Sequence, residues 1–204
     1  MRTGPSLAGL LLLAGPAPVG SALAQPAPRV LPSRDVALVY QVGGAARDAI
    51  PGGIPGAVRI AWSAQLQSLR VEPEGGSQAL LLDLAGPPGR QRVEIVDSGL
   101  RTAMSLKMRS KDLEPLTLQG ARLTRRGQST VAGQSCTDYA VEARRGHGTL
   151  CLTEDGVTLR ADGEVDGRKG RFTAVSVSYG TQPPRLFKVP PGYMQLALPE
   201  VSRP

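Results

Sequence analysis

Apolar and polar residues alternate with a period of two along most of this chain, which is typical of β-strands with one buried face. Val36, Leu38, Tyr40 and Val42, for example, fall on one face of a predicted strand at 35–42. The predicted strands are 35–42, 57–67, 79–84, 92–97, 100–108, 137–143, 149–153, 157–161 and 171–179.

Turn sequences separate these strands at the short spacing of an antiparallel meander. The predicted turns are 74–76, 86–89, 97–99, 126–127, 154–156 and 166–167, all of which contain glycine. Many strands have one polar face, as strands of antiparallel sheets do when one side meets water. The pattern therefore predicts a mainly β, single-domain protein with an antiparallel sheet and little helix.

Three segments depart from the alternation. Ser110 to Gln119 is a modest helix candidate, with Ser110 as its cap and Pro115 limiting its length. Gly43 to Gly56 is so rich in glycine and proline that we expect a flexible loop. Arg185 to Leu198 is expected to form a closing turn and strand that dock against the body.

The N-terminus has the layout of a secretory signal peptide. Arg2 gives a positive start, an apolar run follows at 7–14, and Ala22 and Ala24 are the small residues before a cut. Pro16 and Pro18 interrupt a run that would otherwise suggest a membrane anchor, which needs about 20 apolar residues. We expect residues 1–24 to be removed and the single domain, 25–204, to be exported to the periplasm.

The formal charge of +7 suggests an anionic partner. A GC-rich genome, whose codons favour arginine, would produce the same excess of basic over acidic residues without any such partner. Export argues against nucleic acid as that partner. An anionic membrane surface is the better candidate. The pattern says nothing about the oligomeric state.

Both cysteines, Cys136 and Cys151, lie in a strand region, with the single histidine, His147, between them. A thioredoxin-type redox pair would need C-x-x-C at a helix start, and a zinc site usually needs four ligands. An exported protein with two cysteines is expected to pair them in a disulfide.

The parity of the two strands places both sulfurs on the face opposite to Tyr139, Val141, Leu150 and Leu152, so the two can meet. Direct cross-strand pairing would centre the hairpin at Ala143 and Arg144, whereas the glycines stand at 146 and 148. Either a bulge near the tip or a bridge between residues that are not directly opposite would resolve this mismatch.

The segments GQSTVAGQSCTDY, residues 127–139, and GTLCLTEDGVTLR, residues 148–160, resemble a motif of exported bacterial proteins of the DUF4412 type. The run 80–108 and LFKVPPGY, residues 186–193, are similar to other segments of that family. These proteins are similar to the half-barrels of lipoprotein carriers of the LolA/LolB type. The resemblance implies a curved antiparallel sheet whose concave face can hold acyl chains, and therefore a lipid or lipoprotein ligand.

Three functional hypotheses follow. The first is a non-catalytic binding protein for a lipid, acyl chain or other apolar ligand, with no cofactor or metal. Methionine side chains adapt to irregular apolar ligands, although methionines on the apolar face of a strand are equally expected in an ordinary hydrophobic core. Its candidate ligand-binding residues are Tyr40, Trp62, Met104, Leu106 and Met108.

The second hypothesis is a structural or interaction protein of the cell envelope that uses basic clusters on anionic lipid or binds a protein partner. The clusters are Arg122, Arg125 and Arg126; Arg144 and Arg145; and Arg168, Lys169 and Arg171.

The third is an enzyme that uses paired carboxylates from Glu154, Asp155, Asp162, Glu164 and Asp166. The chain contains no nucleophile, zincin or phosphate-loop motif, so we expect no catalysis.

Overall fold

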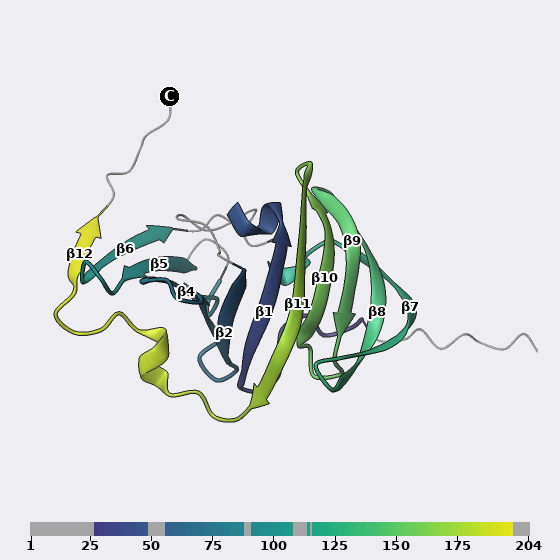
Figure 1. Ribbon diagram of the computed structural model, residues 1–204, viewed down its shortest axis with the longest axis horizontal. Helices are drawn as coiled ribbons and strands as arrows, with labels where there is room; N and C mark the ends of the chain where they lie inside the picture. The colour runs from purple at the N-terminus through teal and green to yellow at the C-terminus, as the bar shows by residue number, and fades with distance from the viewer. Residues whose placement is uncertain (1–26, 49–55, 88–90, 108–113, 115, 198–204) are drawn as a thin grey trace, which may run out of the picture.

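The computed structural model describes residues 27–48, 56–87, 91–107, 114 and 116–197. Within them, twelve strands form one sheet in the order β12-β6-β5-β4-β3-β2-β1-β11-β10-β9-β8-β7 (Figure 1). The strands are β1 (Val36–Gly44), β2 (Ala57–Ser63), β3 (Ser68–Pro73), β4 (Gln78–Asp83), β5 (Arg92–Asp97), β6 (Thr102–Lys107), β7 (Arg122–Val131), β8 (Gln134–Ala143), β9 (Gly146–Leu152), β10 (Thr158–Val165), β11 (Arg168–Tyr179) and β12 (Met194–Ala197). Neighbouring strands are antiparallel except β6 and β12, which are parallel. The predicted fold class is confirmed.

The chain builds this sheet outward from β1. Strands β1 to β6 form a meander in one direction, and the chain then crosses to the far edge and returns through β7 to β11, which pairs with the free side of β1 (Figure 1). Strand β7 contacts β11 although three strands separate them in the sheet. This contact shows that the half from β7 to β11 is strongly curved. Its inner face is therefore enclosed on several sides.

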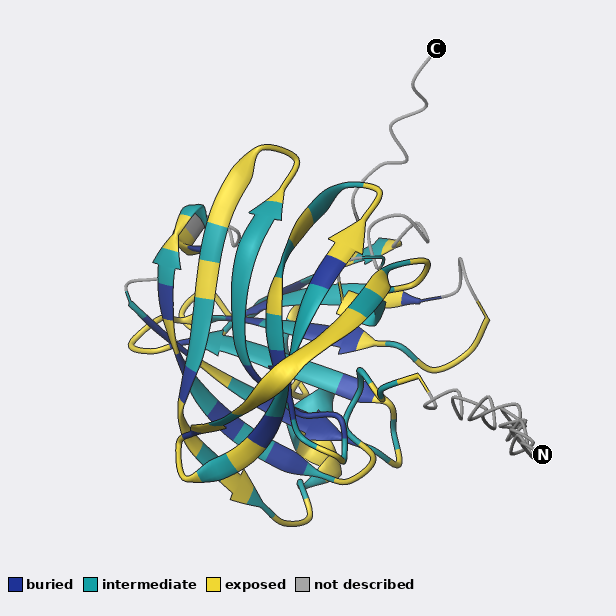
Figure 2. Ribbon diagram, turned by 90° about the vertical axis from the view of Figure 1, so that its right-hand side faces the viewer, coloured by how far each residue is buried: buried dark blue, intermediate teal, exposed yellow. Residues whose placement is uncertain are grey.

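Apolar residues on the inner face line up in cross-strand rows. One row runs from Val36 through Trp62, Leu69, Leu82 and Val93 to Leu106. The main core is built on this face of the central strands and includes Val36, Leu38, Tyr40, Val58 and Trp62. Figure 2 shows how buried and exposed positions alternate along the strands, as the sequence pattern predicts.

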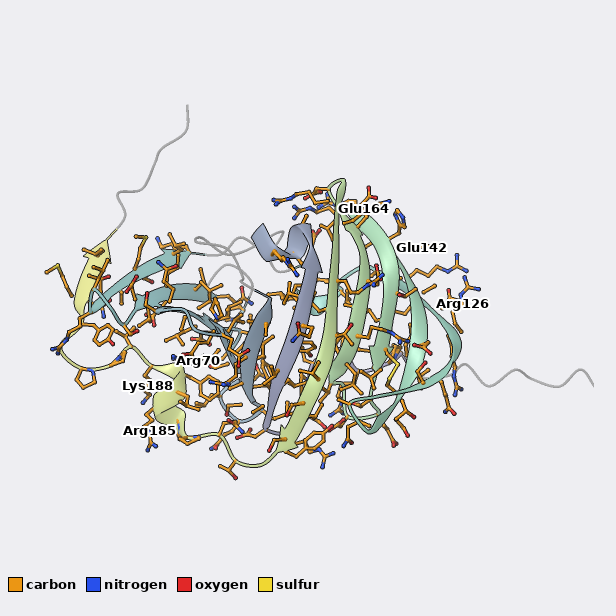
Figure 3. The ribbon with its side chains drawn as sticks, viewed as in Figure 1. Arg70, Arg126, Glu142, Glu164, Arg185 and Lys188 are labelled. Atoms are coloured by element: carbon orange, nitrogen blue, oxygen red, sulfur yellow. A yellow bond between two sulfur atoms is a disulfide. The ribbon has the colours of Figure 1, made fainter. Side chains whose placement is uncertain are left out.

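The C-terminal segment closes the other face of the first meander. A short 3-10 helix, η2 (Pro184–Phe187), leads to Val189 and Tyr193, which pack on a small cluster of Leu81, Val96 and Ala103. Arg70 donates from Nη1 to the carbonyl oxygen of Leu186 at 3.2 Å, and Figure 3 shows Arg70 beside this helix. The predicted docking of this segment is confirmed.

Several local expectations need correction. The turn expected at Arg126 and Gly127 lies inside β7, where the register with β8 shifts at a β-bulge. Strands β3 and β7 were not predicted, and β2 ends at Ser63 rather than continuing to residue 67.

The segment expected to be a loop from Gly43 to Gly56 begins as ordered structure. Gly43 and Gly44 end β1, and a 3-10 helix, η1 (Ala45–Asp48), follows. Residues 49–55 lie outside the described part of the chain. So do residues 110–113 and 115 of the predicted helix at 110–119, whereas Glu114, Leu116 and Thr117 are described and helical, and Leu118 and Gln119 form a turn.

Four glycines form one continuous row across the inner face of the curved half. Gly44 of β1 lies opposite Gly170, Gly170 opposite Gly163, and Gly163 opposite Gly148. A Cβ atom on Gly148 would lie 2.5 Å from the Asp162 carbonyl oxygen, and one on Gly163 would lie 2.6 Å from the carbonyl oxygen of His147. Because glycine in a strand permits a tight bend and a close approach of backbones, this row accounts for the curvature.

Candidate ligand-binding site

The inner face of the curved half carries a groove of about 800 Å³, which we call the apolar groove. Strands β8 to β11 form its floor, and η1 flanks it together with Glu114, Leu116, Leu118, Gln119 and Gly120. Its main apolar side chains are Leu116, Leu118, Val141, Leu150, Ala161 and Phe172. Grooves that bind small apolar molecules are concave and lined in this way.

Glycines determine where this groove has room. Gly146, Gly148, Gly163 and Gly170 all line it and contribute no side chain, while Leu150 of β9 and Phe172 of β11 flank Ala161 of β10 on the same face. The Phe172 ring also makes an edge-on contact with Tyr40, with ring centroids 6.4 Å apart. The wall of the groove is thereby continuous with the main core.

A second concavity, of about 1040 Å³, lies toward the β7–β8 turn, and we call it the polar groove. Its lining contains Gln128, Thr130, Ser135, Thr137 and Tyr139 from β7 and β8. The N-terminal residues Ala27, Pro28 and Arg29 form another part of the lining, and Arg125 completes the basic side. Hydroxyl and guanidinium groups of this kind bind polar or anionic groups.

Four of the five predicted ligand-binding residues lie on the inner face. Tyr40 and Trp62 are buried in the main core, where the Tyr40 hydroxyl donates to the Thr158 carbonyl oxygen and Trp62 Nε1 donates to that of Pro32 at 2.9 Å. Met104 and Leu106 are half-buried on the inner face of β6, and Met108 lies outside the described residues. None of the four described residues lines the apolar groove.

The apolar residues that line the apolar groove were not among the predicted ligand-binding residues, although charged residues named for other roles, such as Arg144 and Glu164, also line it. Val141 and Leu150 belonged to predicted strands, but nothing in the alternation distinguishes a groove wall from ordinary core. The available signal was the glycine spacing: Gly146 and Gly148 stand two residues apart on one strand, so both face the same side. Glycines at period-two positions mark a sharply bent sheet with an open inner face.

The predicted disulfide joins Cys136 and Cys151. No register shift occurs between β8 and β9, and Cys151 lies opposite Asp138, two residues from Cys136. Of the two explanations for the hairpin mismatch, bridging between residues that are not directly opposite is therefore correct. The disulfide indicates an oxidising compartment outside the cytoplasm.

The two cysteines are almost fully buried, at 4% exposure for Cys136 and 0% for Cys151. Cys151 lies in one cross-strand row with Asp138 and Arg160, on the face of the sheet opposite to Leu150. Arg160 Nη2 lies 2.9 Å from Asp138 Oδ1, so this ion pair spans β9 at the position of Cys151. The disulfide is thus shielded from solvent by its own strand neighbours.

The carboxylates considered for catalysis do not face one another as an acid–base pair. Asp162 and Asp166 bind Arg171 and Arg145, and Asp155 binds Arg34 at the opposite end of β10. Among the residues that the structure describes, no three His, Cys, Asp or Glu side chains are grouped so as to hold a metal ion.

Two of the three basic clusters meet at one end of the curved half. Arg145 of the β8–β9 turn pairs with Asp166 of the β10–β11 turn, which brings these turns together. Acidic residues are interspersed there: Arg144 binds Glu114 at 3.1 Å, and Figure 3 shows Glu142 and Glu164 at the same end of the strands. Arg126, in contrast, projects away from the body at β7 (Figure 3). This mixed surface gives little support to binding through a uniform basic patch.

Asp155 fixes the N-terminal segment to the sheet. Its carboxylate accepts hydrogen bonds from Arg34 Nε at 2.6 Å, from Thr153 Oγ1 at 2.5 Å and from the Tyr179 hydroxyl at 3.3 Å. The Arg34 guanidinium carbon also lies 3.7 Å from the centroid of the Tyr179 ring. Burial favours a raised pKa for Asp155, but the Thr153 and Arg34 hydrogen bonds outweigh it and lower the pKa below its ordinary value.

We expect this lowered pKa to make the protein less stable in acid. A carboxyl group whose pKa is lower when folded stabilises the fold above its unfolded value of about 3.9, and this stability is lost as the pH falls through the folded value. Asp155→Asn should lower the free energy of unfolding at pH 7 by about 1–2 kcal/mol. Below a pH of about 4, the free energy of unfolding of this variant should depend less on pH than that of the wild type. Urea unfolding between pH 7 and pH 3 measures both effects. The control Glu74→Gln, at an exposed turn, should keep the acid dependence of the wild type.

No protein-family model matches the sequence, and no curated protein does, so the resemblance to DUF4412-type proteins stays a prediction. Among solved structures, an uncharacterized conserved protein from Thermus thermophilus is similar, with a TM-score of 0.54 at 11% identity, over 81% of this chain and 91% of that chain. MucB has a TM-score of 0.43 at 16% identity, over 80% of this chain and 60% of that chain.

A putative outer membrane lipoprotein-sorting protein domain from Vibrio parahaemolyticus has a TM-score of 0.37 at 8% identity, over 78% of this chain and 91% of that chain. At these identities and scores, the Thermus protein shows a shared fold, and the other two add no conclusion about this chain. No helix among the described residues is long and apolar enough to span a bilayer.

Proposed function

We propose that this protein is exported to the periplasm, with its signal peptide cut after Ala24, and binds an apolar or amphipathic ligand without catalysis. The observation that carries the proposal is the apolar groove: about 800 Å³ on the inner face of a strongly curved sheet, with Leu116, Leu118 and Phe172 among its walls. The disulfide supports export.

Met104 and Leu106 belong to the same proposal. Both are half-buried on the inner face of β6, in rows of apolar residues that begin at β1. We assign them, with Met108, to an extension of the ligand-binding face, while Tyr40 and Trp62 support that face from the core.

Native mass spectrometry of protein purified gently from the periplasm tests the proposal. We expect a stoichiometric lipid-like adduct that is lost on denaturation, on a chain that begins at Gln25. Leu116→Glu should reduce the adduct severalfold, because a carboxylate at the wall opposes burial of apolar groups. Since Leu116 is 39% exposed, the variant should remain folded.

Leu100→Glu is the matched control, because Leu100 is 74% exposed and does not line the groove. A protein with no adduct, and with no affinity for added fatty acids, would contradict the proposal. The function would then be better sought in contacts with a protein or with an anionic membrane surface.

A further inference from the structure

The polar and apolar grooves lie along one face of the same strand. Register places Ser135, Thr137, Tyr139, Val141 and Ala143 on the inner face of β8. The first three line the polar groove, and the last two line the apolar groove. These five positions span about 26 Å at the usual strand rise of about 3.3 Å per residue.

The two grooves meet at a single cross-strand pair. Tyr139, in the polar groove, is the direct partner of Leu150, in the apolar groove, and Arg125 is the partner of Tyr139 on the other side. In this row across the sheet, the guanidinium of Arg125, the phenol of Tyr139 and the aliphatic side chain of Leu150 therefore follow one another. A molecule that fills both grooves must have a polar end and an apolar end.

The charges of the two ends differ. In the polar groove, Arg29 and Arg125 face only one acidic lining residue, Glu154, and neither arginine forms an ion pair within the described part of the chain. At the apolar groove, by contrast, Arg144 and Arg145 bind the carboxylates of Glu114 and Asp166. The polar end thus has excess positive charge together with the hydroxyl groups of Thr130, Ser135 and Thr137.

We propose that the ligand is an anionic amphiphile, with a single acyl chain in the apolar groove and an acidic head group against Arg125. This inference rests on the proposed function and adds the polarity and the orientation of the ligand. Arginine binds carboxylate and phosphate heads through charge-assisted hydrogen bonds, and the hydroxyl groups of Tyr139, the cross-strand partner of Arg125, and of Thr137, two residues along β8, can donate to the same head group.

Calorimetric titration with matched twelve-carbon probes tests this inference, each used below the concentration at which it forms micelles. The probes are dodecanoate, dodecyl phosphate, neutral monolauroylglycerol and zwitterionic dodecylphosphocholine. We expect the two anionic probes to bind most tightly, and the stronger of the two identifies a carboxylate or a phosphate head. Raising the ionic strength should weaken them, because salt screens exposed charges.

Arg125→Gln should weaken the anionic probes by about threefold to tenfold, or about 0.6–1.4 kcal/mol, and leave the neutral probe unchanged. Arg122→Gln is the matched control, because Arg122 stands on the same strand, opposite Glu142, on the outer face. It should leave all four affinities unchanged. Leu116→Glu should weaken every probe.

The outcomes separate the two proposals. If anionic and neutral probes bind equally and Arg125→Gln changes nothing, this inference is overturned while the proposed function stands. If the zwitterionic probe binds most tightly, the inference is also overturned. If no probe binds, the proposed function itself fails.

Discussion

Gly148→Ala is expected to destabilise the protein by about 2–3 kcal/mol, which is large for the addition of one methyl group. The new Cβ atom would lie 2.5 Å from the Asp162 carbonyl oxygen and 2.8 Å from the Gly163 Cα atom. Both contacts are with backbone, so no side chain can move aside and the two strands must separate. The entropy that alanine removes from the unfolded chain, about 0.4–1 kcal/mol, offsets only part of this cost.

Urea unfolding followed by far-ultraviolet circular dichroism measures the change. Gly127→Ala is the control, because Gly127 also lies in a strand of the curved half, has no positive φ angle, and a Cβ atom there would meet nothing within 4 Å. It should be neutral or slightly stabilising. Equal unfolding midpoints for the two variants would show that the glycine row does not enforce the curvature.

Removal of the disulfide is expected to cost about 3 kcal/mol in the chain-entropy model, because Cys136 and Cys151 close a loop over a sequence separation of 15. Cys136→Ala/Cys151→Ala should lower the urea midpoint accordingly. Because both cysteines are buried, the native wild-type protein should also resist dithiothreitol until it unfolds.

Thiol titration with and without denaturant checks the second effect. Ser135→Ala is a suitable control for substitution in this strand, because Ser135 neighbours Cys136 and is exposed. Rapid reduction of the native protein, or an unchanged midpoint for the double variant, would mean that the bridge adds little to stability.

The sequence predicted the strands that have one buried and one exposed face. Strand β1 shows why: Val36, Leu38, Tyr40 and Val42 are all buried, and the intervening residues are not. Such alternation is imposed by the pleat itself, so it can be read without knowledge of any partner strand. The disulfide was predictable on chemical grounds, because two cysteines that follow a predicted signal peptide are expected to pair.

The edge strand β7 was missed because its residues do not alternate. Most of its positions are exposed, and a bulge near Arg126 interrupts its register. Edge strands lack a neighbour on one side and often carry charges and bulges there. The local sequence therefore reads as a turn, and only pairing with β8 shows it to be a strand.

The sequence by itself determined the fold class and the cysteine bridge, because the two-residue pleat and the chemistry of paired thiols act locally. The tertiary structure alone decided where a ligand can bind. Tyr139 and Leu150 are neighbours only because β8 and β9 pair in that register, and Arg125 joins them only because β7 lies beside β8. The groove itself depends on glycines from four strands that meet in one row. Such a row is a property of strand register, which the order of residues along one strand does not specify.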